Sequence, residues 1–241
     1  YSGGRPRGSF YIVLILVVLA LAAYGLRGRV TSVEHAVTLL GAKVIQNLVL
    51  TATVLDTLSS GARLLFQHSI AAGVAARSIM RSHIFGNVLD PEEAFAYGLL
   101  HDIGKLQIPG DIIEADGALS ADEIELMKTH SRGTLDVLQR LHAIEEIARW
   151  ASYHHETPDG QGYPFHVAGD ALPLEARIIN VADVFQALAQ DRPYHRPLEP
   201  AEILAILKDR VANGKADATV VATVEADLDN CHRIALCRPS R

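Results

Sequence analysis

The stretch Leu99-Leu100-His101-Asp102-Ile103-Gly104-Lys105 places an imidazole and a carboxylate side by side at the end of an apolar segment. The residues before it, 91–100, read as a helix, with Pro91 at its first position and Asp90 as N-cap. Two glutamates follow the proline, where the positive end of the helix dipole favours them. A charged pair at a buried helix end needs a partner, and a divalent metal suits both groups. The sequence therefore predicts a metal site at His101 and Asp102.

Apolar residues recur at helical spacing along most of the chain, and almost nothing reads as strand. A further helix begins at Ser120, where Glu123 completes a capping box. The connection 108–111 is expected to be a loop. We expect the other helices over 31–41, 44–58, 63–83, 144–155, 174–190, 199–212 and 218–231. The predicted fold class is all-α: a helical bundle whose core can hold converging ligands, as di-iron carboxylate bundles do.

The composition bounds the function classes that the chain can serve. With 241 residues, of which 49% are hydrophobic and 21% charged, it is long enough for one large globular domain or two small ones. The net charge of −6 argues against a nucleic acid polymer as partner. The 11 histidines contrast with two cysteines, Cys231 and Cys237, which argues against a disulfide framework and against a cysteine-based zinc site. A reducing cytoplasm fits this usage, so the expected localisation is cytoplasmic.

The N-terminal segment, residues 1–23, contains an unbroken apolar run over 10–23 with arginines on both sides. This run is shorter than the roughly 20 residues of a typical membrane span. We interpret it as a buried helix of a truncated domain. A signal peptide and an association with the membrane stay open as alternatives.

Seven residues are candidate metal ligands: His68, His101, Asp102, His130, His154, His155 and Asp183. Each has an ordinary explanation when taken alone; Asp183, for example, could pair with Arg177 one turn away. Together they are too many for one ion and about right for two ions that share a carboxylate. Asp102 is the natural bridge. Nitrogen and oxygen ligands favour iron or manganese, with zinc, nickel or magnesium left open, and disfavour calcium.

These residues lie within a longer pattern, in which His68 and the His101-Asp102 stretch are followed by His130-x-x-Gly133, His154-His155-Glu156-x-x-Asp159-Gly160-x-Gly162-Tyr163-Pro164, Asp183 and Asp191-Arg192-Pro193-Tyr194. This pattern resembles the HD-GYP family, metal-dependent phosphodiesterases of the HD superfamily that degrade the bacterial messenger cyclic di-GMP. The resemblance covers about 61–230, and we assign 61–241 to such a domain.

The resemblance implies a role for each matching position. The seven candidates match the metal ligands, and Asp102 and Lys105 match catalytic residues, with Lys105 approaching the scissile phosphate. Arg192 matches a residue that binds a substrate phosphate. Gly162, Tyr163 and Pro164 match the loop that shapes the substrate groove and contacts diguanylate cyclase domains. The implied substrate is cyclic di-GMP and the implied products are pGpG and/or GMP; a homodimer is left open.

Three departures from the family pattern bear on activity. Leu64 replaces a glutamate that accompanies a third metal in some members, so we predict a site for two. Gln186 replaces a frequent aspartate, which we expect to remove a carboxylate near Lys105. Residues 114–117 replace a frequent Lys-Pro-Gly turn.

Residues 24–60 resemble the latter part of an HDOD domain, a helical signalling module, through Tyr24-Gly25 and the stretch 30–42. Two alternatives to cyclic di-GMP hydrolysis therefore stay open. One is a phosphohydrolase for another cyclic nucleotide. The other is a signalling scaffold with little or no activity.

Overall fold

The computed structural model describes residues 62–81, 85, 90–113, 115, 117–140, 144–190 and 196–236. The chain divides into two units, Tyr1–Ala62 with Pro239–Arg241, and Arg63–Arg238. The apolar segment 1–23, the HDOD-like segment 24–60 and Arg192 lie outside the described residues. All described residues except Ala62 belong to the second unit.

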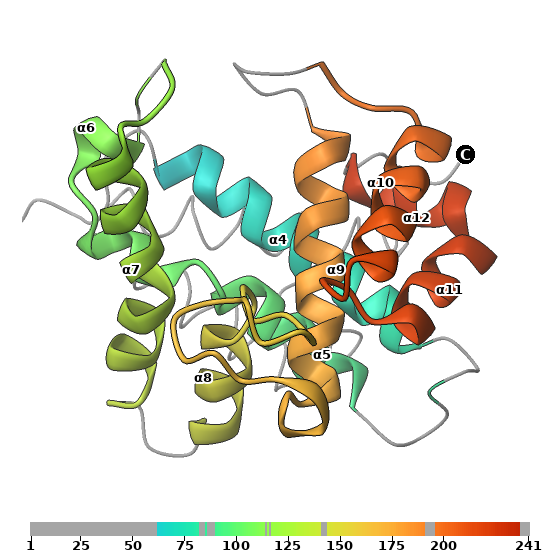
Figure 1. Ribbon diagram of the computed structural model, residues 1–241, viewed down its shortest axis with the longest axis horizontal. Helices are drawn as coiled ribbons and strands as arrows, with labels where there is room; N and C mark the ends of the chain where they lie inside the picture. Colours follow the sequence, from blue (N-terminus) through green and yellow to red (C-terminus); the bar gives the residue numbers. More distant parts are fainter. Residues whose placement is uncertain are drawn as a thin grey trace, which may run out of the picture. The chain divides into compact units, whose positions relative to one another are not determined.

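The described residues form helices and no strand, which confirms the all-α prediction for this part of the chain (Figure 1). None of these helices combines the length and the hydropathy that crossing a membrane requires. The elements are α4 (Ala62–Met80), α5 (Pro91–Leu100), η1 (Ile103–Gln107), α6 (Gly110–Ile113), α7 (Ala121–Leu138), α8 (Glu145–Ser152), η2 (Gly169–Ala171), α9 (Leu174–Ala189), α10 (Pro200–Ala212), α11 (Ala218–Ala226) and α12 (Leu228–Ala235).

Two helix starts that the sequence predicts are confirmed by their capping contacts. The Asp90 side chain accepts a hydrogen bond from the backbone N–H of Glu92 at 2.9 Å, directly before α5. Ser120 and Glu123 form the reciprocal capping box at the start of α7. These caps depend on residues close in sequence, which explains why pattern reasoning finds them.

Several predicted boundaries are wrong. The expected loop at 108–111 contains the start of the short helix α6, and α4 ends at Met80. Helix α8 ends at Ser152 rather than at residue 155: Tyr153, with ψ of 6°, is its C-cap, and Asn180 of α9 donates to the carbonyl of His154 at 2.9 Å beyond it. The single helix expected over 218–231 is two, α11 and α12, separated at Asp227, whose φ of −136° is not helical.

The core between these helices is built mainly of buried apolar side chains. Helices α5 and α9 contribute its largest fully buried side chains, among them Phe95, Tyr97 and Phe185. In Figure 1, α8 stands between α7 and α9, and α5, which passes behind α9 in this view, contacts both α8 and α9. The loop between α8 and α9 crosses the same region, so residues from five segments can meet there.

Candidate metal centre

The end of α5 is held against α7 by a close backbone contact. Gly104 of η1 donates its N–H to Thr134 Oγ1 at 3.0 Å, and the same hydroxyl donates to the carbonyl of His101 at 2.7 Å. A Cβ atom at Gly104 would lie 1.9 Å from the carbonyl oxygen of His130. Only glycine permits this approach, which brings the ends of α5 and the middle of α7 together.

Three histidines are oriented in the same way by their own backbone. His101, His130 and His154 each pair Nδ1 with the carbonyl oxygen three residues earlier, at 2.6 Å in every case. A ring that donates from Nδ1 presents an unprotonated Nε2, which is how metal-binding histidines are commonly fixed. The three Nε2 atoms are therefore the candidate ligand atoms of these histidines.

The two carboxylate oxygens of Asp102 face different histidines. Oδ2 lies 3.5 Å from Nε2 of both His68 and His101. Oδ1 lies 3.3 Å from Nε2 of His130 and 3.9 Å from Nε2 of His154. One carboxylate thus stands between two groups of imidazoles, as a bridge between two ions requires.

The remaining candidates complete the two groups. Asp183 Oδ1 lies 2.9 Å from His68 Nε2 and 3.6 Å from His101 Nε2. The ring of His155 lies 4.0 Å from that of His154 and 5.1 Å from that of His130, measured between centroids. The ligand atoms of His68, His101 and Asp102 lie within 4.8 Å of one another, as do those of His130, His154 and His155. The structure therefore brings all seven sequence candidates together.

Buried polar atoms without partners indicate that this centre fits a cation. Among the described residues, His101 Nε2 and Asp102 Oδ1 are buried and accept no hydrogen bond from protein. Such atoms are costly to bury unless something coordinates them. The donor set of imidazole nitrogens and carboxylate oxygens, without thiolates, suits a divalent metal of the iron, manganese or zinc type.

The charge states suit the same conclusion. Burial alone would raise the pKa of the Asp102 carboxyl, but Lys105 and the surrounding histidines outweigh it and hold this pKa well below its usual range. The pKa of Asp183 also lies well below its usual range, because its interactions with His101 and His68 outweigh its burial. Both carboxylates are therefore ionised, and available as ligands, at neutral pH.

The second group of histidines is kept neutral. Burial lowers the pKa of His130, and lowers that of His154 well below its usual value. Burial also lowers the pKa of His155 to about 3. Neutral imidazole is the form that binds a metal. His101 differs: its burial lowers the pKa, but the charges of Asp102 and Asp183 outweigh that effect and raise it.

The loop that follows His155 is closed by a buried carboxylate that the sequence analysis did not assign to the site. Glu156 accepts hydrogen bonds from the backbone N–H groups of residues 165, 166 and 167 at 2.6, 3.1 and 3.0 Å. A Cβ at Gly162 would lie 2.5 Å from the Glu156 Cα, so glycine is required where the loop folds back. The ring of Tyr163 consequently lies 4.7 Å from that of His155. The signal for Glu156 was its place inside the quoted motif.

Asn180 is a second residue that the sequence analysis missed, and nothing but its place one turn before Asp183 distinguished it. Its side chain donates to the carbonyl of His154 and thereby anchors the loop to α9.

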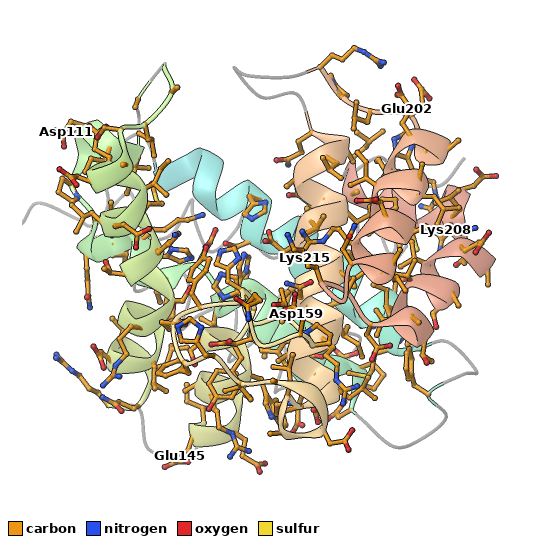
Figure 2. All side chains as sticks on the ribbon, in the orientation of Figure 1. Asp111, Glu145, Asp159, Glu202, Lys208 and Lys215 are labelled. Atoms are coloured by element: carbon orange, nitrogen blue, oxygen red, sulfur yellow. The ribbon has the colours of Figure 1, made fainter. Side chains whose placement is uncertain are left out.

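The same loop is also attached to the turn between α10 and α11. Figure 2 shows Asp159 and Lys215 near each other in front of α9. There the N–H of Asp159 donates to the carbonyl of Gly214 at 3.0 Å, which attaches the loop to the turn between α10 and α11.

The structure describes Lys105 and the possible Asp183–Arg177 ion pair, but not Arg192. Lys105 Nζ donates to Asp102 Oδ2 at 2.5 Å, at the edge of the histidine cluster. Asp183 does not use Arg177, which pairs with Asp217 at 2.8 Å, so the ordinary explanation of Asp183 is wrong. The residues around Arg192 are not described.

A family model described as "HD domain" matches residues 53–220, which is more than half of the chain. The chain belongs to the HD domain family. Solved structures agree with this fold. An HDG"Y"P protein from Bdellovibrio bacteriovorus aligns with a TM-score of 0.58 at 14% identity, over 93% of this chain and 69% of that one. The HD domain of the L. monocytogenes phosphodiesterase PgpH, in complex with cyclic-di-AMP, aligns with a TM-score of 0.55 at 17% identity, over 74% of this chain and 94% of that one.

Curated relatives confirm the resemblance to phosphodiesterases of this family. A 3'3'-cGAMP-specific phosphodiesterase of Vibrio cholerae is 32% identical over 198 residues, 82% of this chain and 45% of the relative. A cyclic di-GMP phosphodiesterase response regulator of Xanthomonas campestris is 46% identical over 97 residues, 39% of this chain and 26% of the relative. This HD domain chain thus spans less than half the length of these relatives. The matches give no support to the HDOD-like assignment of 24–60.

Proposed function

We propose that the chain is a metal-dependent phosphodiesterase that hydrolyses cyclic di-GMP to pGpG and/or GMP. The observation that carries the proposal is the placement of Asp102, whose two buried oxygens face two separate groups of histidines. Membership of the HD domain family and the phosphodiesterase relatives support it.

Two divalent ions, iron or manganese from the donor set, would be held by two groups of residues. His68, His101 and Asp183 would hold one, and His130, His154 and His155 the other, with Asp102 shared between them. When bound, the metals would supply Lewis acidity toward the phosphate and lower the pKa of a water molecule.

The chain's own residues would do the rest. The carbonyl contacts of His101, His130 and His154 keep Nε2 of each ring directed into the centre before substrate arrives, so little reorganisation is needed. Lys105, whose side chain is 22% exposed, can leave Asp102 and donate to a phosphate oxygen as negative charge develops there. The loop closed by Glu156 holds the ring of Tyr163 4.7 Å from that of His155, at the edge of the proposed centre.

The test is direct incubation with substrate. Purified full chain, loaded anaerobically with iron(II) or manganese(II), is incubated with cyclic di-GMP, and the products are separated by chromatography. We expect pGpG, followed by GMP if the groove accepts the linear product. No product with either metal, in protein shown to contain metal, would contradict the proposal.

A second substrate deserves the same assay because of the relatives specific for 3'3'-cGAMP. If the chain hydrolyses 3'3'-cGAMP much faster than cyclic di-GMP, the reaction class stands and the substrate assignment changes. Binding of either dinucleotide without turnover would support the scaffold alternative.

The resemblance also predicts protein partners, and these predictions can be tested separately from hydrolysis. A contact of Gly162, Tyr163 and Pro164 with diguanylate cyclase domains can be tested by comparing capture of a purified cyclase domain by the parent chain and by Tyr163→Ala. A homodimer is tested by light scattering after gel filtration.

A further inference from the structure

One ligand histidine is oriented by a side chain rather than by its own backbone. Nδ1 of His68, on α4, is hydrogen-bonded to Oε1 of Gln186, on α9, although the two residues are 118 positions apart. His101, His130 and His154 instead use the carbonyl three residues earlier. The orientation of His68 therefore depends on the identity of one distant residue.

Gln186 is placed where its chemistry matters. The side chain of Gln186 is fully buried. Among the described residues its amide Nε2 has no hydrogen-bond partner, and its Oε1 is hydrogen-bonded to His68. It lies one turn after Asp183, which faces the other nitrogen of the same ring, Nε2, at 2.9 Å. The two α9 side chains thus hold His68 from both sides.

We propose that Gln186 is a positioning residue for the metal ion bound by His68, His101 and Asp183, and that it sets the affinity of that position. An imidazole that binds metal through Nε2 must carry its proton on Nδ1, so its partner there must be an acceptor. The Gln186 oxygen supplies the acceptor without adding a negative charge. This inference rests on the proposed metal centre and not on the substrate.

The departure from the family pattern gains a physical meaning from this contact. At the sequence level Gln186 was expected to cost a carboxylate near Lys105, whereas the contact that the structure records is with His68. A glutamate at this place has the same reach, could also accept from Nδ1, and would add a charge that strengthens the histidine as a ligand. The amide of Gln186 therefore keeps the acceptor for His68 but lacks that added charge.

The experiment is a manganese(II) titration of the metal-free full chain, followed by the electron paramagnetic resonance signal of the free ion. His68→Ala identifies which of the two binding steps belongs to the His68 position. Gln186→Leu removes the acceptor, and Gln186→Met does so with an unbranched chain of similar length. Gln186→Glu restores an acceptor at the same reach. Thr223→Val is the matched control, because Thr223 is also buried and hydrogen-bonded but lies on α11.

We expect Gln186→Leu and Gln186→Met to weaken the step that His68→Ala abolishes by about 10–100-fold, the usual effect of losing such a support. Gln186→Glu should bind at least as tightly as the parent chain, and Thr223→Val should be unchanged. Parent-like binding by both apolar variants, or equal weakening by Gln186→Glu, would overturn the inference and leave the metal centre standing. If His68→Ala leaves both steps intact, the proposed centre fails and the inference falls with it.

Discussion

At the scale of single residues, Asp102 and Lys105 lie in contact but have separable roles. Asp102 is shared by both groups of histidines, so its removal takes a ligand from each. Lys105 contacts Asp102 but belongs to neither group of ligand atoms. Loss of the lysine should therefore affect chemistry without affecting metal content.

The prediction is that Asp102→Ala loses both metal and activity, whereas Lys105→Met retains metal and loses turnover by on the order of 100-fold. Metal content is measured by elemental analysis of the purified variants, and turnover by chromatography with cyclic di-GMP. A Lys105→Met protein that also lacks metal would refute the role given to Lys105.

The site residues that the sequence predicts differ in chemistry from those that it does not predict. The seven ligand candidates are chemically distinctive and recur in a quoted motif, so pattern reasoning finds them. The partners that orient them are ordinary residues whose role appears only when distant segments meet: Gln186 beside His68, and Asn180 beside His154. The same reason makes Arg177 a false partner for Asp183, since Asp217 lies closer in space.

At the scale of elements, the site depends on how closely η1 packs on α7. Gly104 lies so close to the α7 backbone that an added Cβ would clash with it, at 1.9 Å from the His130 carbonyl oxygen. His101 and Asp102 lie just before Gly104 in sequence, and the contact of Gly104 is with the backbone of His130. The contact therefore holds the first two residues close to the third. A small shift of η1 would separate ligands that must share an ion.

Gly104→Ala should therefore destabilise the fold by about 1–3 kcal/mol through overpacking and also weaken metal binding. Gly110→Ala, at the start of α6, is the matched control, because a Cβ there meets nothing within 4 Å. Chemical denaturation gives the free energy of unfolding, and a metal titration gives the affinity. Equal behaviour of the two variants would show that the close contact does not support the site.

Helix boundaries show the same limit. The caps at Asp90 and Ser120 are local, and the sequence predicts them. The early end of α8 at Tyr153, where ψ is 6°, and the break at Asp227, where φ is −136°, carry no such local signal. Periodicity reports which residues face a core, but not where a tertiary contact ends a helix.

At the scale of the whole molecule, the metal centre joins segments that are far apart in sequence. Its candidate ligands come from α4, the end of α5, α7, the turn after α8, and α9. A metal bound only by the folded chain stabilises it, by about 2.7 kcal/mol per site at a free concentration of 100 times Kd. Metal binding should thus be visible as global stability.

Chelation should lower the melting temperature of the parent chain by several degrees, and added manganese(II) should restore it. Differential scanning calorimetry measures both. Asp102→Ala serves as control, because it lacks the shared ligand and should melt at the same temperature with or without chelator. A parent chain that is insensitive to chelation, after metal analysis has found metal in it, would argue that the ions lie outside this centre.

The central claim is that Asp102 stands between two metal ions. The most direct measurement is an anomalous difference map from crystals of the manganese-loaded chain, collected at the manganese edge. We expect two peaks, one beside each carboxylate oxygen of Asp102, with His68, His101 and Asp183 around one and His130, His154 and His155 around the other. No peak at Asp102, or peaks among other residues, would contradict the account.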